Sequence, residues 1–258
     1  MTRAVGAVSA EDAIPPGFEL AGRFVLVTGG ARRVGAAISS HLADRGARVV
    51  VQTRSPDEEA RRFVAGLATP CHLGVSDLSD ADGAERILEE ATSAGFPVTA
   101  VIHAASSFVH SGPLELDGAG WNRVMDTNLR SFYLLARSLA ARAERGDLIA
   151  ISDSGALELW PGYLAHCVSK AALVTLTLAL AKAMAPRFRV NAVLPGPVLP
   201  PPEADDAERE RMARRTLLGR LGEPADVARA VRFLLESPFA TGTTLEVTGG
   251  AHLWRSAP

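Results

Sequence analysis

Short apolar runs alternate with helical patterns through most of the chain, and this alternation restricts its fold more than any other feature. The apolar runs predict strands over residues 23–27, 48–51, 71–75, 99–103, 147–152, 189–194 and 244–247. The segments between them predict helices over residues 34–45, 80–93, 118–144, 162–185 and 224–236. Strands that alternate with helices build βαβ units and a parallel sheet. We therefore predict an α/β fold, a doubly wound parallel sheet with helices on both faces.

The composition fits one globular domain and argues against several classes of partner. At 258 residues the chain has the length of one large domain, which we place over residues 21–258. A net charge of −2 with no basic stripe predicts that the protein does not bind nucleic acid. No apolar run approaches the roughly 18 to 20 residues of a membrane span, and no signal peptide is recognisable. The two cysteines cannot form a disulfide framework, so we predict a cytoplasmic protein with no membrane partner.

Two segments depart from the alternating pattern. Residues 1–20 mix small residues, acids and a Pro-Pro-Gly break, which predicts an N-terminal arm. Residues 197–215 are rich in proline and charge and follow the sixth predicted strand. Because ligands of open α/β sheets bind at the carboxyl ends of the strands, this segment is predicted to be a lid over the site. The charged run at 205–211 is expected to form a solvated helix.

A glycine-rich turn joins the first strand to the first helix, over residues Thr28–Gly35. Glycines at such a turn let the backbone approach a phosphate, and the helix N-terminus supplies free N–H groups. This context predicts a Rossmann-type dinucleotide-binding fold. The middle glycine of the usual pattern is Arg33, whose charge suits a pyrophosphate. The residues of this turn predicted to contact the cofactor are Thr28, Gly29, Arg32, Arg33 and Val34.

The end of the second strand indicates which dinucleotide binds. An acidic residue at this point would bind the ribose hydroxyls of NAD, whereas arginine suits the 2′-phosphate of NADP. This chain has Thr53, Arg54 and Ser55 there, so we predict NADPH as the cofactor. Asp77 and Leu78 follow the third strand and are predicted to lie beside the adenine.

Over about residues 20–254 the chain resembles the short-chain dehydrogenase/reductase family. The segment Arg189–Gly196 and the tail Thr248-Gly249-Gly250 are typical of that family. The resemblance implies a homotetramer assembled through the two long helices, predicted at 118–144 and 162–185. It also implies further cofactor contacts from Ala105, Ser106, Lys170, Pro195, Gly196 and Val198.

More narrowly, the chain resembles the pteridine reductases. Their phosphate turn has the same Thr-Gly-x-x-x-Arg-x-Gly form, and Ser106-Ser107-Phe108 matches their Ser-Ser-Phe after the fourth strand. The resemblance implies that Phe108 stacks on a pterin and sandwiches it against the nicotinamide. It implies contacts of Arg33 and Ser106 with the cofactor phosphate or the pterin. Tyr163 matches a substrate-pocket tyrosine of the same subfamily.

The catalytic region supports this subfamily and then departs from it. Lys170, one of two lysines in the chain, matches the family's catalytic lysine, and Asn128 matches its proton-relay asparagine. Asp153 stands where most of the family has serine and pteridine reductases have aspartate, which implies roles in catalysis and substrate binding. The position of the family's tyrosine is His166. Residues 163, 166 and 170 are spaced i, i+3 and i+7, so we predict that they share one helix face opposite Asp153.

A second departure lies after the fourth strand. The family's Asn-Asn-Ala-Gly or Asn-Asn-Ala-Ser is here His103-Ala104-Ala105-Ser106. Ala104 lacks the amide that normally ties the strand ends, which predicts lower local rigidity. Cys167 points about 100° away from His166 on the helix and is interpreted as a packing residue. The remaining histidines show no metal-ligand spacing, so we predict no metal; they are His41, His72, His110 and His252.

Hydride transfer requires a positioned acceptor and a source of a proton. Asp153 and His166, with no tyrosine at 166, suit reduction of a C=N bond better than reduction of a ketone. The first hypothesis is therefore an NADPH-dependent reductase whose small-molecule substrate is a pterin or another flat nitrogen heterocycle. Two alternatives stay open. One is an atypical enzyme that uses His166 for specialised biosynthetic or redox-neutral chemistry, and the other is a non-catalytic NADPH-binding protein.

Overall fold

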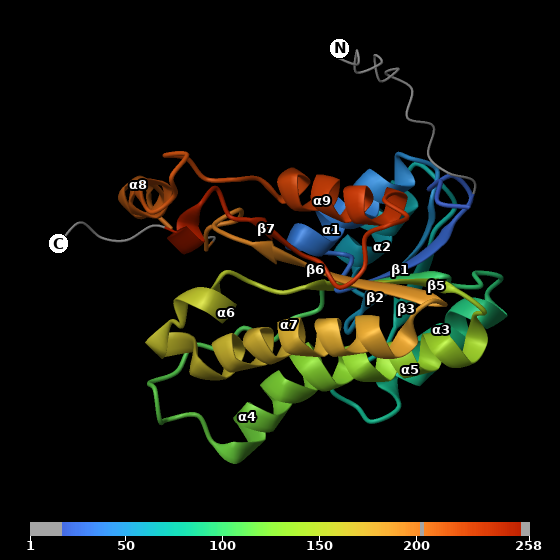
Figure 1. The fold of residues 1–258 in the computed structure, drawn as a ribbon, viewed down its shortest axis with the longest axis horizontal. Helices are drawn as coiled ribbons and strands as arrows, with labels where there is room; N and C mark the ends of the chain where they lie inside the picture. The colour runs from blue at the N-terminus through green and yellow to red at the C-terminus, as the bar shows by residue number, and fades with distance from the viewer. Residues whose placement is uncertain (1–16, 202–203, 254–258) are drawn as a thin grey trace, which may run out of the picture.

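A seven-stranded parallel sheet forms the centre of the computed structural model, which describes residues 17–201 and 204–253 (Figure 1). The strand order is β3-β2-β1-β4-β5-β6-β7. The chain adds β2 and β3 on one side of β1 and then crosses to add β4 to β7 on the other side, so the strand order reverses between β1 and β4. In such sheets the ligand crevice lies at this switch point, outside the carboxyl ends of the strands. The strands are β1 (Phe24–Thr28), β2 (Arg48–Thr53), β3 (His72–Val75), β4 (Ala100–His103), β5 (Gly146–Ile151), β6 (Phe188–Pro195) and β7 (Thr244–Val247).

Two layers of helices cover the sheet, which confirms the predicted doubly wound fold (Figure 1). One layer contains α1 (Arg33–Ala43), α2 (Glu58–Ala65) and α9 (Pro224–Glu236). The other layer contains α3 (Gly83–Ser93), α4 (Gly118–Met125), α5 (Ser131–Arg142) and α7 (Leu164–Met184). Two further helices, α6 (Gly155–Glu158) and α8 (Asp206–Arg214), lie together at one end of the molecule.

The continuous apolar runs of the strands are explained by burial on both faces of the sheet. Val25 and Val27 of β1 pack in the cluster that includes α1 and α9, whereas Leu26 packs in the cluster under α5 and α7. In β2, Val49 packs in the cluster of α1 and α9, and Val50 packs in the cluster under α5 and α7. Successive side chains of a strand point to opposite faces, so a strand between two helical layers must be apolar at every position.

The helical assignments differ from the sequence prediction at three places. Helices α2 and α6 were not predicted, because they have only eight and four residues. Helix α2 nevertheless has a short apolar stripe of Ala60, Phe63 and Val64 that packs on the core. The predicted helix 118–144 is two helices, α4 and α5, separated by a π-helical turn at Asp126–Arg130. The predicted helical segment is confirmed, but the prediction of one continuous α-helix missed the π turn, in which the backbone bonds i→i+5 instead of i→i+4. Such turns occur frequently at functional sites, and here the turn carries the buried Asn128.

The segments that departed from the alternating pattern are partly described. Most of the predicted arm 1–20 lies outside the described residues, and Leu20 at its end is buried in the core. Helix α8 has no buried residue, which confirms a solvated helix within the segment 197–215.

One described helix is long and apolar enough to cross a membrane by length and composition, in contrast to the sequence prediction. It covers Pro161–Met184 with a mean hydropathy of 1.6 over its best window, half of which is buried inside the protein. This segment contains α7, which packs on β6, α6 and α4. A central helix of a doubly wound fold has the same length and apolar composition, so we interpret it as a core helix.

Candidate active site

The backbone of the turn between β1 and α1 has the shape of an anion site. Gly29 adopts a φ of +61°, and its missing side chain lets Ala105 approach it. A Cβ on Gly35 would overlap the carbonyl oxygen of Gly29, so that position also requires glycine. Arg33 keeps the left-handed backbone of the glycine it replaces, with a φ of +52°. The N-cap residue of α1 makes no side-chain cap bond, which leaves the helix N-terminus to another acceptor.

The two arginines of the turn differ in their surroundings. The guanidinium of Arg32 forms ion pairs with Asp57 and Glu59 at the start of α2. Arg33 has no ion pair with any residue that the structure describes. Of the two predicted phosphate ligands, Arg33 is therefore the one whose charge is not already paired.

Thr28 and His103 together fasten the ends of β1 and β4. The Thr28 hydroxyl accepts the N–H groups of Ala104 and Ala105, each at 3.1 Å, and lies 3.0 Å from Nδ1 of His103. His103 Nε2 lies 3.2 Å from the hydroxyl of Ser131. These contacts join the two strand ends without an amide at Ala104, and the lower local rigidity stays a prediction. They also occupy the Thr28 hydroxyl, which was predicted to face the cofactor.

His103 is fully buried, and this determines its protonation. Desolvation, reinforced by the nearby charge of Lys170, lowers the pKa of His103 to about 3. The neutral imidazole has one donor and one acceptor nitrogen, and each nitrogen faces a hydroxyl.

At the end of β2, the residues predicted to select the dinucleotide lie at the surface. Arg54 and Ser55 are exposed, while Thr53 is buried and its hydroxyl bonds to the backbone of Ser55. Burial alone would raise the pKa of Asp77, but hydrogen bonds from Ser79 and the charge of Arg54 lower it overall.

The predicted adenine contact at position 78 has a different environment. Leu78 is only 3% exposed, so its side chain belongs to the interior. A cofactor contact from this residue is therefore limited to its backbone.

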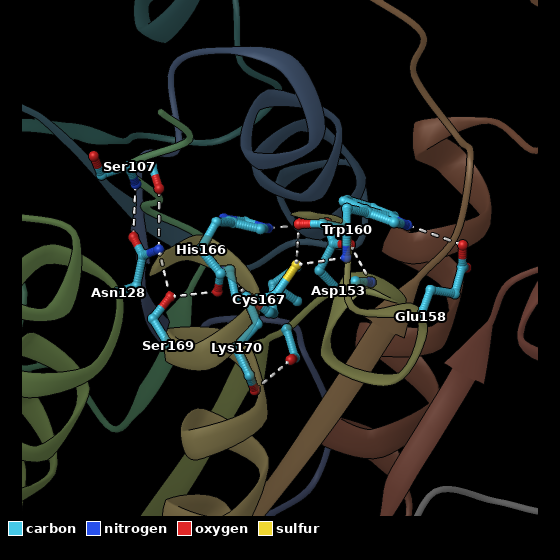
Figure 2. A network of polar contacts seen from close by, with 12 residues as sticks. Ser107, Asn128, Asp153, Glu158, Trp160, His166, Cys167, Ser169 and Lys170 are labelled. Atoms are coloured by element: carbon cyan, nitrogen blue, oxygen red, sulfur yellow. Dashed lines mark hydrogen bonds and ion pairs between the residues drawn. The ribbon is translucent and has the colours of Figure 1, made fainter. Parts of the chain in front are cut away.

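Three of the predicted catalytic side chains lie close together at the carboxyl end of β5 (Figure 2). His166 Nε2 lies 3.6 Å from Oδ2 of Asp153, and Asp153 Oδ1 accepts the N–H of Gly155 at 2.7 Å. Lys170 Nζ donates to the carbonyl of Ile151 at 2.8 Å. Burial lowers the pKa of Lys170 to about 8, against the opposing effect of Asp153.

The His166 ring is the unusual member of this group. It is 2% exposed, and neither of its nitrogens has a hydrogen-bond partner among the described residues. Buried polar atoms of native proteins are nearly always bonded. Both nitrogens can therefore bond a ligand that enters the site.

Asn128 joins the site indirectly (Figure 2). Its Oδ1 accepts the N–H of Ser107 at 2.6 Å, and its Nδ2 donates to the Ser107 carbonyl and to the Ser169 hydroxyl. The Ser169 hydroxyl donates to the backbone carbonyl of His166. Asn128 thus holds in place the loop that carries Phe108.

Aromatic rings surround His166. Phe108 is 53% exposed and stacks on Tyr163 with ring centroids 4.2 Å apart, while the Phe108 and His166 rings meet edge to face at 4.5 Å. His110 and Trp160 also contact Tyr163, and the Trp160 ring is parallel to that of His166. We call these five residues the aromatic cluster.

Helical spacing does not account for Tyr163, because it precedes α7 with φ −136° and ψ 37°. Its ring reaches the cluster by stacking on Phe108. Sequence reasoning missed both His110 and Trp160. The available signal was the Trp160-Pro161-Gly162 turn directly before the helix that carries His166.

Backbone bonds dominate the segment after β6. The N–H of Gly196 donates to Val247, and the carbonyl of Pro195 accepts the N–H of Ser154. Val198 is buried and lines a cavity of about 230 Å³ between this segment and β7, which no residue of the aromatic cluster lines. A groove of about 680 Å³ lies at the opposite, amino end of the strands between α3 and α5, away from the expected ligand edge.

The described residues include no group of three or more His, Cys, Asp or Glu placed to hold a metal ion.

A Rossmann-type sheet, a phosphate turn and a lysine beside a candidate proton donor together define a dinucleotide-dependent oxidoreductase. The family model described as Enoyl-(Acyl carrier protein) reductase matches residues 29–252. The chain belongs to this family of short-chain dehydrogenases and reductases.

Individual relatives agree with this assignment. Carbonyl reductase family member 4 of Danio rerio is 34% identical over 90% of this chain and 98% of its own length. The 3-oxoacyl-[acyl-carrier-protein] reductase FabG of Haemophilus influenzae is 30% identical over 90% of this chain and 99% of its own. The crystal structure of FolM Alternative dihydrofolate reductase 1 from Brucella canis, complexed with NADP, superposes with a TM-score of 0.85. It is 30% identical and covers 93% of this chain and 98% of that one.

Proposed function

We propose that this protein is an NADPH-dependent reductase that transfers hydride to a C=N bond of a pterin or a similar flat nitrogen heterocycle. The observation that carries the proposal is the half-exposed Phe108 ring beside the buried His166 and the partly exposed Asp153. A flat aromatic substrate can stack on Phe108 while its polar edge bonds the carboxylate and imidazole. The similarity to the FolM structure, which is named a dihydrofolate reductase and contains NADP, supports this substrate class.

The cofactor site is proposed from the chain's own residues. The uncapped N-terminus of α1 and the unpaired Arg33 fit a pyrophosphate, and exposed Arg54 and Ser55 fit a 2′-phosphate. When bound, the nicotinamide supplies the hydride. Asp77 and the segment of Pro195, Gly196 and Val198 would complete the site through backbone contacts.

The proton is the second requirement. We assign it to His166, with Asp153 holding the imidazole and binding the substrate edge. Lys170 adds a buried positive charge near both groups, and Asn128 holds the Ser107 loop. Reducing a C=N bond places charge on nitrogen, which an imidazolium can neutralise directly.

The direct test is NADPH oxidation on addition of a dihydropterin, followed by absorbance and by product analysis. We expect turnover with the dihydropterin and less turnover with 3-oxoacyl thioesters, the substrate class in the name of the relative FabG. Turnover only on other substrates would favour the atypical enzyme, and binding of NADPH with no turnover would favour a non-catalytic protein. The proposed homotetramer rests on the resemblance to the family, and the proposed cytoplasmic location rests on the two cysteines, which cannot form a disulfide framework.

Arg54→Ala should reduce the preference for NADPH over NADH by at least roughly tenfold. A guanidinium–phosphate contact contributes about 1.5 to 3 kcal/mol, and that contact is absent with NADH. Dissociation constants of both cofactors from fluorescence titration provide the measurement. Arg61→Ala, which removes an exposed arginine of the neighbouring α2, is the matched control. Equal affinities for the two cofactors in the parent protein would contradict the 2′-phosphate assignment.

Phe108→Ala should weaken binding of a flat heterocycle about twofold to tenfold and leave NADPH affinity nearly unchanged. Offset stacking contributes about 0.5 to 1.5 kcal/mol beyond area burial. Phe108→Leu keeps apolar area without a ring and should show most of the loss. A parallel fall in both affinities would instead identify Phe108 as a packing residue, since it also supports Tyr163.

A further inference from the structure

Trp160 is held at both its backbone and its side chain (Figure 2). Its N–H donates to Sγ of Cys167 at 3.3 Å, and the Cys167 thiol lies 3.8 Å from its carbonyl oxygen. Its indole N–H donates to Oε2 of Glu158 at 3.0 Å. Neither Cys167 nor Glu158 touches the candidate catalytic atoms, so their common effect is to fix Trp160.

The local backbone makes this arrangement possible. Helix α6 ends at Glu158 because Leu159 adopts a left-handed conformation with a φ of +57°, which turns the chain before Trp160. A Cβ on Gly155 would lie 3.0 Å from the indole ring and 3.1 Å from Oδ1 of Asp153. Glycine at 155 therefore lets the indole settle next to the Asp153 carboxylate.

Trp160 forms one wall around the catalytic pair. Its ring is parallel to the His166 ring, with centroids 6.5 Å apart and an angle of 6°. It is nearly perpendicular to the Tyr163 ring at 6.3 Å. A change in the tilt of the indole would alter the space beside Asp153 and His166, where the substrate edge is proposed to bind.

The same Glu158 oxygen reaches a second part of the chain. Arg215 directly follows α8, and its Nη2 lies 3.7 Å from Oε2 of Glu158. Helices α6 and α8 lie at the same end of the molecule (Figure 1). One carboxylate thus connects the α8 segment, residues 204–215, to the indole that borders the site.

We propose that Glu158 is a positioning residue that sets the tilt of Trp160 in the substrate pocket, and that Arg215 couples this tilt to the α8 segment. The inference rests on the proposed function, because the ligand that would contact the Trp160 ring is a flat heterocycle bound between Phe108 and the catalytic pair, His166 and Asp153. In this proposal the Trp160 ring limits the shape of the substrate that fits the pocket, and Glu158 fixes the orientation of that ring. Neither residue exchanges a proton with the substrate.

Steady-state kinetics provide the first test. Glu158→Ala should raise KM for the heterocycle about fivefold to tenfold with kcat and NADPH affinity nearly unchanged, and Glu158→Gln should recover part of this loss, since its amide oxygen still accepts the indole N–H. Arg215→Gln should raise KM about twofold to fivefold, as for other half-exposed ion pairs. Its effect should be clearly smaller in the Glu158→Ala background, because the proposed coupling to Trp160 acts through the Glu158 carboxylate.

Arg214→Gln is the matched control for the α8 segment. Arg214 is the preceding residue, and its partner Glu210 lies on the same helix, so no coupling to Trp160 is expected. Additive effects of Glu158→Ala and Arg215→Gln on KM, or an equal effect of Arg214→Gln, would overturn the proposed coupling.

Near-ultraviolet circular dichroism gives a readout that needs no substrate. The spectrum of the parent protein minus that of Trp160→Phe isolates the Trp160 band, which should decrease in Glu158→Ala and largely return in Glu158→Gln. An unchanged band in Glu158→Ala would overturn the positioning role, and a decreased band with unchanged KM would overturn its link to the substrate pocket. A decreased band in a protein that turns over no heterocycle would support the positioning role and contradict only the proposed function.

Discussion

We expect His166→Phe to lower the turnover of the proposed heterocycle by about a hundredfold to ten-thousandfold, the usual loss when a general acid is removed. The imidazole lies 3.6 Å from Asp153, and its nitrogens are buried without hydrogen-bond partners among the described residues, so it can donate to a bound substrate. Phenylalanine preserves the ring contacts with Phe108 and Trp160. The loss of turnover should therefore arise in the proton-transfer step and not from misfolding. The thermal unfolding temperature of the variant checks that the fold is intact.

Two further variants separate this role from a packing role. His110→Phe changes a second histidine of the aromatic cluster and should keep most of the turnover. His166→Tyr restores the family's residue and should permit ordinary ketone or dihydropterin reduction. If His166→Phe retained most of the rate, Asp153 or water would be the donor.

Acid sensitivity of the fold is the second large effect, and it originates at His103. Folding lowers the pKa of this residue from 6.5 to about 3, so the unfolded chain binds one more proton between these values. The stability contributed by the neutral ring is present above pH 6.5 and is lost as pH falls toward 3. The loss amounts to about 3 kcal/mol at pH 4.

His103→Asn should remove this dependence, because the amide can bond Thr28 and Ser131 without titrating. The measurement is the free energy of unfolding in urea for both proteins from pH 7.5 to about 4. The difference between the two curves isolates His103 from the carboxylates, which titrate in both. His110→Asn, which replaces an exposed histidine, should parallel the parent. A constant difference between parent and His103→Asn would show that His103 is not the group responsible.

Much of the site's neighbourhood was predictable because its residues follow strands. Asp153 and Arg54 come just after predicted strands, Arg33 lies in the turn that follows the first strand, and parallel strands end at one edge of a sheet. His166 and Lys170 share a helix face by local spacing, and the structure places both beside Asp153. The elements that carry these residues were predicted from the continuous apolar runs of the strands and the 3.6-residue period of the helices.

The sequence alone therefore determined the parallel sheet, the phosphate turn and the helix that carries His166 and Lys170, because strand and helix periods are properties of neighbouring residues. Tertiary structure alone decided the π turn at Asn128, whose side chain bonds a loop about twenty residues earlier. It also decided the contact of Glu158 with Arg215, which are far apart along the chain. Such contacts join residues far apart along the chain, and the hydrogen bonds and burial that produce them exist only after the layers have packed.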